Sequence, residues 1–223
     1  AYRKPYPCFT ISQYLADLLN SKFAKPCYVL PPPVDPLFKP VAKAILSEPF
    51  RILISGIFEC TWKGVEVALL AARKLRKAGI PICVVRISLL PQSHEERTIL
   101  AADEYYYCIE PAEVASLTAT ADLCLFASHQ SEGFGLPLIE AMRCGVPVVS
   151  SNIASAIEIT QGELPLFDPL DENAFYCEAQ RILKDRLLWQ QRADIGLELT
   201  KPYTEQVIAK TLVSALEWAT TQS

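Results

Sequence analysis

From residue 50 onward, short apolar runs alternate with longer segments in which apolar residues recur at helical spacing. The apolar runs are nearly continuous, which is typical of strands that are buried on both faces. They lie at 51–56, 81–88, 104–109, 123–128 and 147–152. The segments with helical spacing lie at 63–79, 110–121 and 133–145. This alternation predicts an α/β fold: a Rossmann-like, doubly wound parallel sheet with helices on both faces.

The two ends of the chain have other patterns. Residues 12–20 have helical spacing, and five prolines follow between residues 31 and 40. Prolines at this density favour an extended path and cannot pair inside a sheet. We therefore expect residues 1–40 to be a connector between domains and residues 41–223 to form a ligand-binding domain. A short strand is expected at 164–169, and C-terminal helices after it.

Composition limits the class of function. The 223 residues suit one large domain better than two complete doubly wound ones. A formal net charge of −4 argues against a general nucleic-acid-binding protein. Eight cysteines without C-x-x-C spacing, and only two histidines, do not predict a metal site. Unpaired thiols fit a reducing cytoplasm, which is the expected location.

In a doubly wound sheet, ligands bind beyond the carboxyl ends of the strands. The predicted loops at that edge are 56–63, 86–92 and 128–135. The third loop leads into the densest motif of the chain, SEGFGLPLIE at 131–140. Its glycines let the backbone approach a ligand closely, and Pro137 suits a first helical turn. The free N–H groups of residues 133–136 would then form an anion site, for which a diphosphate is a natural ligand.

Two acids flank this motif. Eight residues of helix rise about 12 Å, so the carboxylates of Glu132 and Glu140 should not meet. The two carboxylates of a glycosidase lie about 5–9.5 Å apart across one bond, and a hydrolase pair is therefore not expected. The spacing better suits two acids that contact different parts of one long ligand.

These residues resemble the signature of retaining glycosyltransferases of family 4, which have the GT-B fold of two Rossmann-like domains. The stretch EGFGLPLIEAMRCGVPVV places seven residues between Glu132 and Glu140, and the strand GVPVVSSN follows. The resemblance runs from about Ser12 to Ala219 and matches only the C-terminal, donor-binding half of such enzymes. It implies that an N-terminal acceptor domain is absent from this chain.

The resemblance implies roles for particular residues. Glu132 would lie beside the donor sugar, and Glu140 would accept hydrogen bonds from the ribose hydroxyls. Lys63 corresponds to the lysine that contacts the diphosphate, and together with Glu132 it is the expected catalytic residue. Glu158 corresponds to another recurrent acid, with a structural role.

Other implied donor contacts come mostly from the backbone. The N–H groups of Gly133, Phe134, Gly135 and Leu136 would hold sugar hydroxyls and phosphate. Gly56 ends the first strand of the domain and would also lie at the donor. The base would be held in the region of Tyr107, Cys108 and Ile109.

The chain departs from the family at one position. Many relatives have an arginine directly after the strand-ending glycine, as a second phosphate cation, and Ile57 stands there in this sequence. Arg86, near the end of the 81–88 strand, or Arg51 could supply the second cation instead.

The expected function is transfer of a sugar from a nucleoside diphosphate sugar, with UDP and a glucose-type sugar favoured, to an acceptor hydroxyl with retention of configuration. The resemblance implies no metal or other cofactor. The expected partners are the donor, a glycan or other hydroxyl acceptor, and the N-terminal domain, whose residues would make any peripheral contact with the inner face of the membrane.

Three other functions compete with this one. A module that binds nucleotide sugars without transferase activity, and a GT-B epimerase or phosphorylase, remain open. An NAD-dependent oxidoreductase needs G-x-G-x-x-G after the first strand, and the loop GIFECTWKG lacks that spacing.

Overall fold

The main body of the molecule is a six-stranded parallel sheet in the order β5-β4-β3-β6-β7-β8. The computed structural model describes residues 8–41 and 46–221, so the first seven residues of the expected connector lie outside the described residues. The strands of the sheet are β3 (Phe50–Ser55), β4 (Ile82–Ser88), β5 (Glu104–Tyr107), β6 (Leu123–Phe126), β7 (Val148–Ser151) and β8 (Leu166–Phe167). This order confirms the predicted doubly wound sheet.

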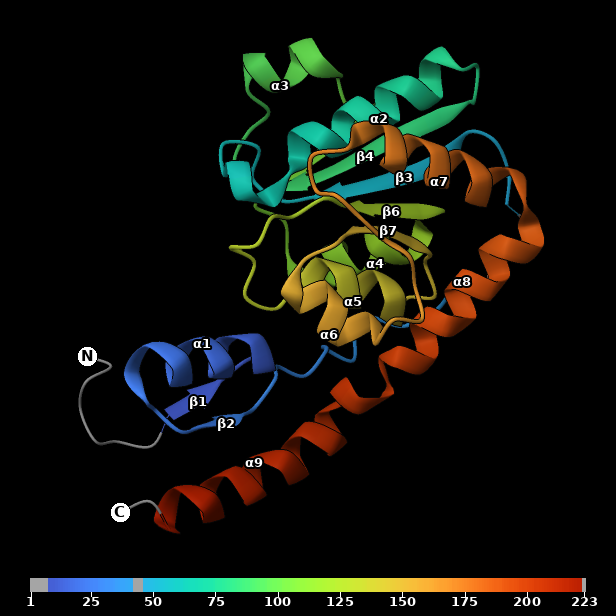
Figure 1. The fold of residues 1–223 in the computed structure, drawn as a ribbon. Coiled ribbons are helices and arrows are strands. Elements are labelled where there is room, and N and C mark those ends of the chain that lie inside the picture. Colours follow the sequence, from blue (N-terminus) through green and yellow to red (C-terminus); the bar gives the residue numbers. More distant parts are fainter. Residues whose placement is uncertain (1–7, 42–45, 222–223) are drawn as a thin grey trace.

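Helices cover both faces of the sheet (Figure 1). One face carries α2 (Val65–Lys77) and α7 (Glu172–Lys184), which pack on it through a core that includes Leu69 and Phe175. The other face is covered by α4 (Pro111–Thr120), α5 (Leu136–Arg143) and α6 (Ala154–Thr160), around a core that includes Met142. The apolar strands are buried because both of their faces are covered.

The direction of winding reverses between β3 and β6, which are neighbours in the sheet. The chain leaves β3 toward α2 on one face and leaves β6 toward α5 on the other face (Figure 1). A crevice therefore opens at their carboxyl ends, where doubly wound proteins bind ligands.

A close backbone contact joins the two loops at this crevice. Gly64 has φ +60°, and a Cβ placed on it would stand 1.8 Å from the carbonyl oxygen of Ala127. Beside it, the N–H of His129 donates to the carbonyl of Trp62 at 2.7 Å. Only glycine can occupy position 64 without separating the two loops.

The helix expected from residue 63 is divided at this glycine. The short 3₁₀ helix η1 (Thr61–Lys63) precedes it, and α2 begins only at Val65. Lys63 therefore lies in a tight turn at the crevice instead of in the first turn of α2.

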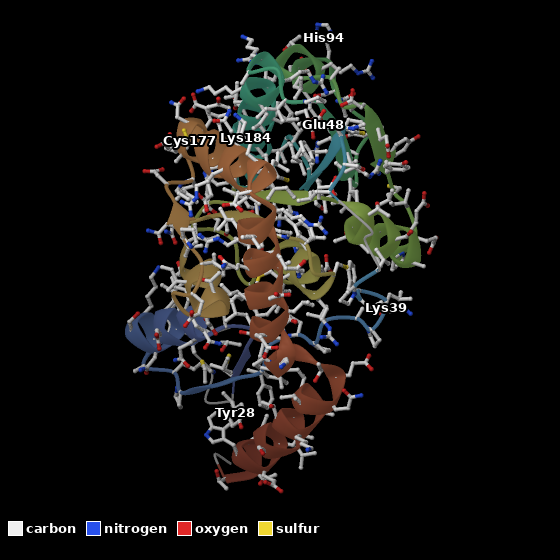
Figure 2. The ribbon with its side chains drawn as sticks, turned by 90° about the vertical axis from the view of Figure 1, so that its right-hand side faces the viewer. Tyr28, Lys39, Glu48, His94, Cys177 and Lys184 are labelled. Atoms are coloured by element: carbon white, nitrogen blue, oxygen red, sulfur yellow. The ribbon has the colours of Figure 1, made fainter. Side chains whose placement is uncertain are left out.

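A second difference lies between β4 and β5, where the structure contains a short helix, α3 (His94–Ile99), that the sequence pattern did not predict. His94 is exposed at its start, at the opposite end of the molecule from Tyr28 (Figure 2). Ser93 caps this helix, and Glu96 on it is buried by an ion pair with Arg86. The residue that α3 buries is a glutamate, so the helix lacks the spaced apolar residues by which the other helices are predicted.

Two long helices close the chain. They are α8 (Arg186–Leu199) and α9 (Glu205–Thr221), with the 3₁₀ turn η2 (Lys201–Tyr203) between them. The C-terminal helices expected after the 164–169 strand are confirmed. Within the described ranges, no helix has the length and apolarity needed to span a membrane.

The N-terminal segment has more structure than its pattern suggested. Strands β1 (Cys8–Thr10) and β2 (Cys27–Val29) pair in parallel, and α1 (Gln13–Phe23) connects them. Helix α9 returns to this unit, where Trp218 packs against Phe9 and Tyr28 with ring centroids 6.2 and 5.7 Å away (Figure 1). The helix expected at 12–20 is confirmed, whereas the two three-residue strands were not predicted. Whether residues 1–40 connect two domains remains a prediction.

The glycine contact gives a stability prediction with a matched control. Gly79 also has positive φ, at +77°, but a Cβ there would meet nothing within 4 Å. Gly79→Ala should therefore cost only the left-handed backbone penalty, about 1 kcal/mol. Gly64→Ala should lower the free energy of unfolding by at least ~2 kcal/mol more, because backbone must move. Equal losses for both variants in urea unfolding would refute the contact.

Candidate functional site

A cavity of about 560 Å³ lies at the crevice between the carboxyl ends of β3 and β6. The carboxyl ends of β3 and β4 with the loops after them, the loops after β5 and β6, helices α4 and α5, and two residues of the N-terminal segment form its wall. The lining residues are Ile11, Pro32, Ser55, Gly56, Ile57, Lys63, Ile87, Ser88, Leu89, Ile109, Val114, Glu132, Gly133, Phe134, Gly135, Leu136, Pro137 and Glu140.

The start of α5 presents unpaired backbone donors to this cavity. The N–H groups of residues 133–136 donate to no partner within the described chain, and all four residues line the cavity. Gly135 has φ +95° as the N-cap of α5, and Pro137 stands in the first turn. Phe134 anchors the turn in the core, because its buried ring packs on Tyr203 with centroids 5.6 Å apart. Four donors and a helix start in one place make a site for an anion.

The one basic side chain that lines the cavity, among the described residues, is Lys63. Its Nζ lies 2.7 Å from Oε2 of Glu132, and the hydroxyl of Ser128 donates to the same oxygen at 3.3 Å. The lysine comes from the loop after β3 and the acid from the loop after β6, so the ion pair spans the crevice. An anion that enters must take Lys63 from Glu132 or share it.

Glu140 stands on the same wall, one turn into α5. Its burial raises the pKa of the carboxyl group to about 7, and the negative charge of Asp35 adds to this rise. No hydrogen bond to the Glu140 carboxylate is present within the described residues. An acid held without a partner against a cavity is a common feature of ligand sites.

The structure brings most of the sequence-predicted residues to one cavity. Gly56, Lys63, Ile109 and both acids line it, together with the turn at 133–136. Both acids therefore face one cavity, which is the arrangement expected for two acids at different parts of one ligand.

Tyr107 and Cys108 do not line the cavity. Strand β5 ends at Tyr107, whose side chain is 54% exposed, and the chain then turns at Cys108 with φ +51°. The thiol of Cys108 donates to the carbonyl of Leu89 at 3.2 Å, outside the lining. Only Ile109 of this predicted group reaches the cavity.

Neither candidate for a second cation reaches the cavity, and this corrects the expectation for both. Arg86 is fully buried and pairs with Glu96 at 2.6 Å. Arg51 lies near the start of β3, at the amino ends of the strands and away from the cavity, and pairs with Glu104 at 2.6 Å. An arginine at the end of an apolar strand can turn into the core when a buried carboxylate compensates its charge.

Some lining residues had no signal in the sequence. Ile11 and Pro32 come from the segment that the sequence predicts to be a connector. Ile11 reaches the motif because the carboxylate of Glu158 accepts from the N–H of Gln13, at 2.9 Å to each oxygen, and so fixes the start of α1. The Cδ1 atom of Ile11 lies 3.4 Å from where a Cβ on Gly133 would stand. Such contacts between distant segments depend on the tertiary fold.

Within residues 8–41 and 46–221, no three His, Cys, Asp or Glu side chains are grouped closely enough to hold a metal ion. Among the described residues, the charged side chains that line the cavity are those of Lys63, Glu132 and Glu140.

Comparison with known proteins places this site in a family. The family model described as "Glycosyl transferases group 1" matches residues 49–185, which carry both loops of the crevice. O-antigen chain mannosyltransferase B of Escherichia coli is 46% identical over 74 residues, which are 33% of this chain and 19% of that protein. The chain therefore aligns with about a fifth of that relative.

Solved structures agree on the fold. Sucrose-phosphate synthase from Thermosynechococcus elongatus superimposes with a TM-score of 0.79 at 22% identity, over 97% of this chain and 59% of that one. The pneumococcal O-GlcNAc transferase GtfA, solved with UDP and GlcNAc, superimposes with a TM-score of 0.78 at 16% identity, over 96% of this chain and 45% of that one. The sheet and its helices are those of the Rossmann-like half of a GT-B fold. Because the family model matches well over half of its residues, the chain belongs to the group 1 glycosyl transferases.

Proposed function

We propose that this chain is the donor-binding half of a retaining glycosyltransferase that uses a nucleoside diphosphate sugar. The observation that carries the proposal is the set of four unpaired N–H groups at 133–136, which face a cavity that also contains Lys63. Backbone donors at a helix start and one lysine fit a diphosphate better than a single carboxylate. Membership of the group 1 glycosyl transferases supports the same chemistry.

The cavity orients the donor along its length. The diphosphate lies at the turn 133–136 and at Lys63, and the ribose hydroxyls donate to Glu140. The sugar lies beside Glu132, and the base lies toward Ile109. The complex of GtfA with UDP and GlcNAc supports a donor of the UDP-sugar type, on a protein with the same fold.

Charge stabilisation is the contribution of this half to the reaction. When the bond between the anomeric carbon and the diphosphate breaks, negative charge develops on the leaving phosphate. The N–H groups of the turn and the ammonium group of Lys63 stabilise that charge without a metal ion. Because Lys63 moves to the phosphate, Glu132 is released to accept hydrogen bonds from the sugar hydroxyls.

Retention follows from attack on the face from which the diphosphate leaves. The oxygen of the acceptor hydroxyl bonds to the anomeric carbon, and its proton passes to an oxygen of the leaving phosphate. The acceptor binds between two domains, so this chain binds the donor but needs its N-terminal partner domain for transfer. If the chain proves to bind donors within a protein that lacks transferase activity, it is a nucleotide-sugar-binding module.

A thermal-shift screen with UDP, GDP and ADP sugars tests the proposal. A ligand at one hundred times its dissociation constant should stabilise the chain by about 2.7 kcal/mol. We expect the largest shift with a UDP-sugar. Lys63→Ala should raise the dissociation constant of that ligand about tenfold or more, because it removes a charge-assisted hydrogen bond to phosphate.

Lys39→Ala is the matched control, since Lys39 is exposed and points away from the body of the molecule (Figure 2). Its affinity should equal that of the unsubstituted chain. The proposal is wrong if none of the three nucleotide sugars shifts the melting temperature. Strong visible absorbance of bound pyridoxal phosphate would instead favour the phosphorylase alternative.

Donor binding should depend on pH through Glu140. The carboxylate form accepts the ribose hydroxyls, and the pKa of about 7 means that this form increases between pH 6 and 8. The affinity for UDP-glucose, whose diphosphate does not titrate in this range, should rise about tenfold from pH 6 to pH 8. Glu140→Gln should give a flat profile by calorimetry. A profile that keeps its slope in Glu140→Gln would show that another group titrates.

The same acid should lower stability at neutral pH. Its pKa is about 7 in the folded chain against the ordinary 4.5, so the unfolded chain loses this proton first as pH rises. The free energy of unfolding therefore falls between pH 4.5 and 7. Glu140→Gln should raise it at pH 8 by up to about 3 kcal/mol and leave pH 4 nearly unchanged. A variant that is less stable at pH 8 would contradict this cause.

A further inference from the structure

A buried ion pair lies directly behind the loop that carries Lys63. Nε of Arg86, on β4, lies 2.6 Å from Oε1 of Glu96, on α3. The side chains are 0% and 1% exposed. The ion pair is therefore out of reach of a ligand, and any effect on the cavity must pass through the residues that it contacts.

The remaining donors of Arg86 hold the end of β3. Its Nη1 donates to the carbonyl of Ile54 at 2.6 Å, and its Nη2 donates to the carbonyl of Gly56 at 2.9 Å. The guanidinium group also lies 5.7 Å from the centre of the Tyr105 ring, on β5. One side chain of β4 thus contacts the carboxyl end of β3 and a ring on β5, the strands on either side of it.

Gly56 transmits this contact to the cavity. It lines the cavity and has φ +132°, and a Cβ placed on it would stand 3.3 Å from Cβ of Lys63. The carbonyl that Arg86 holds and the base of the Lys63 side chain are therefore neighbours. We therefore expect a shift of the backbone at Gly56 to change the position of Lys63.

Stability alone does not account for this arrangement. Replacing a buried ion pair by apolar side chains is often neutral or stabilising, because two charges must lose their water. An apolar side chain at position 86 could fill the space, but it could not donate to two backbone carbonyls. The particular contribution of Arg86 is the position of the Gly56 carbonyl.

We infer that Arg86, oriented by Glu96, is a positioning residue for the donor diphosphate. Its guanidinium group anchors the Gly56 carbonyl and so fixes the loop 56–63, which places the ammonium group of Lys63 at the phosphate. This inference rests on the proposed function and adds a residue that touches neither the donor nor the reacting atoms.

A double-mutant cycle on UDP-glucose binding tests the inference. Arg86→Lys keeps the charge but cannot reach Glu96 and both carbonyls at once. In the otherwise unsubstituted chain it should raise the dissociation constant about tenfold by calorimetry. In a Lys63→Ala background it should have less than about a threefold effect, because Arg86 acts through Lys63.

Arg51→Lys is the matched control. Arg51, on β3, also binds a glutamate of another strand, with hydrogen bonds of 2.6 and 2.9 Å to Glu104 on β5. It lies at the amino ends of the strands, however, away from the cavity. It should leave the affinity unchanged in both backgrounds. If Arg86→Lys does not fold, Glu96→Gln takes its place in the same cycle, since it removes the charge that orients Arg86.

The outcomes separate the two claims. If the unsubstituted chain binds UDP-glucose and Arg86→Lys weakens it equally with and without Lys63, or not at all, the positioning role is wrong and the proposed function stands. If the unsubstituted chain binds no nucleotide sugar, the proposed function falls and the inference falls with it.

Discussion

The contact between Gly64 and the carbonyl of Ala127 is the constraint on which the site depends. It brings the loops after β3 and β6 together at the point where the sheet reverses its winding. The ion pair between Lys63 and Glu132 joins the same two loops, one residue before this glycine and a few residues after Ala127. The wall of the cavity follows from this approach, since the same loops lead into α2 and into the turn before α5. A backbone contact between two loops thus determines where charged side chains meet.

The charges at the cavity are unusual for an anion site. One lysine faces two acids, and in the described structure the lysine is already paired with one of them. Binding of a diphosphate must therefore depend on the unpaired N–H groups at 133–136, which carry no net charge and need no counterion. The buried pair of Arg86 and Glu96 fits this picture, because a single available cation is useful only if it is held in place. Burial raises the pKa of Glu140 to about 7, so that near neutral pH only part of the protein has the carboxylate that binds hydroxyls.

The sequence predicted the parts that follow a period or a motif. Continuous apolar strands and amphipathic helices indicated the sheet, and the glycines around Phe134 indicated the turn. Three features had no such signal. Strands β1 and β2 have three residues each, too few for alternation to be recognised. Ile11 lines the cavity beside the start of α1, where the N–H of Gln13 donates to Glu158, a residue distant in the sequence. The sequence offers Arg86 as a replacement for the phosphate arginine whose place Ile57 takes, but its partner Glu96 is ten residues away on a helix that the sequence pattern did not predict.

The most direct measurement is a crystal structure of this chain with UDP-glucose bound. We expect the diphosphate to lie within hydrogen-bond distance of the N–H groups at 133–136, with Nζ of Lys63 moved from Glu132 to a phosphate oxygen. We also expect the ribose hydroxyls at Glu140. A donor bound elsewhere on the molecule, or one bound in this cavity with the ion pair of Lys63 and Glu132 intact and its phosphates away from the turn, would show that the proposed donor site is wrong.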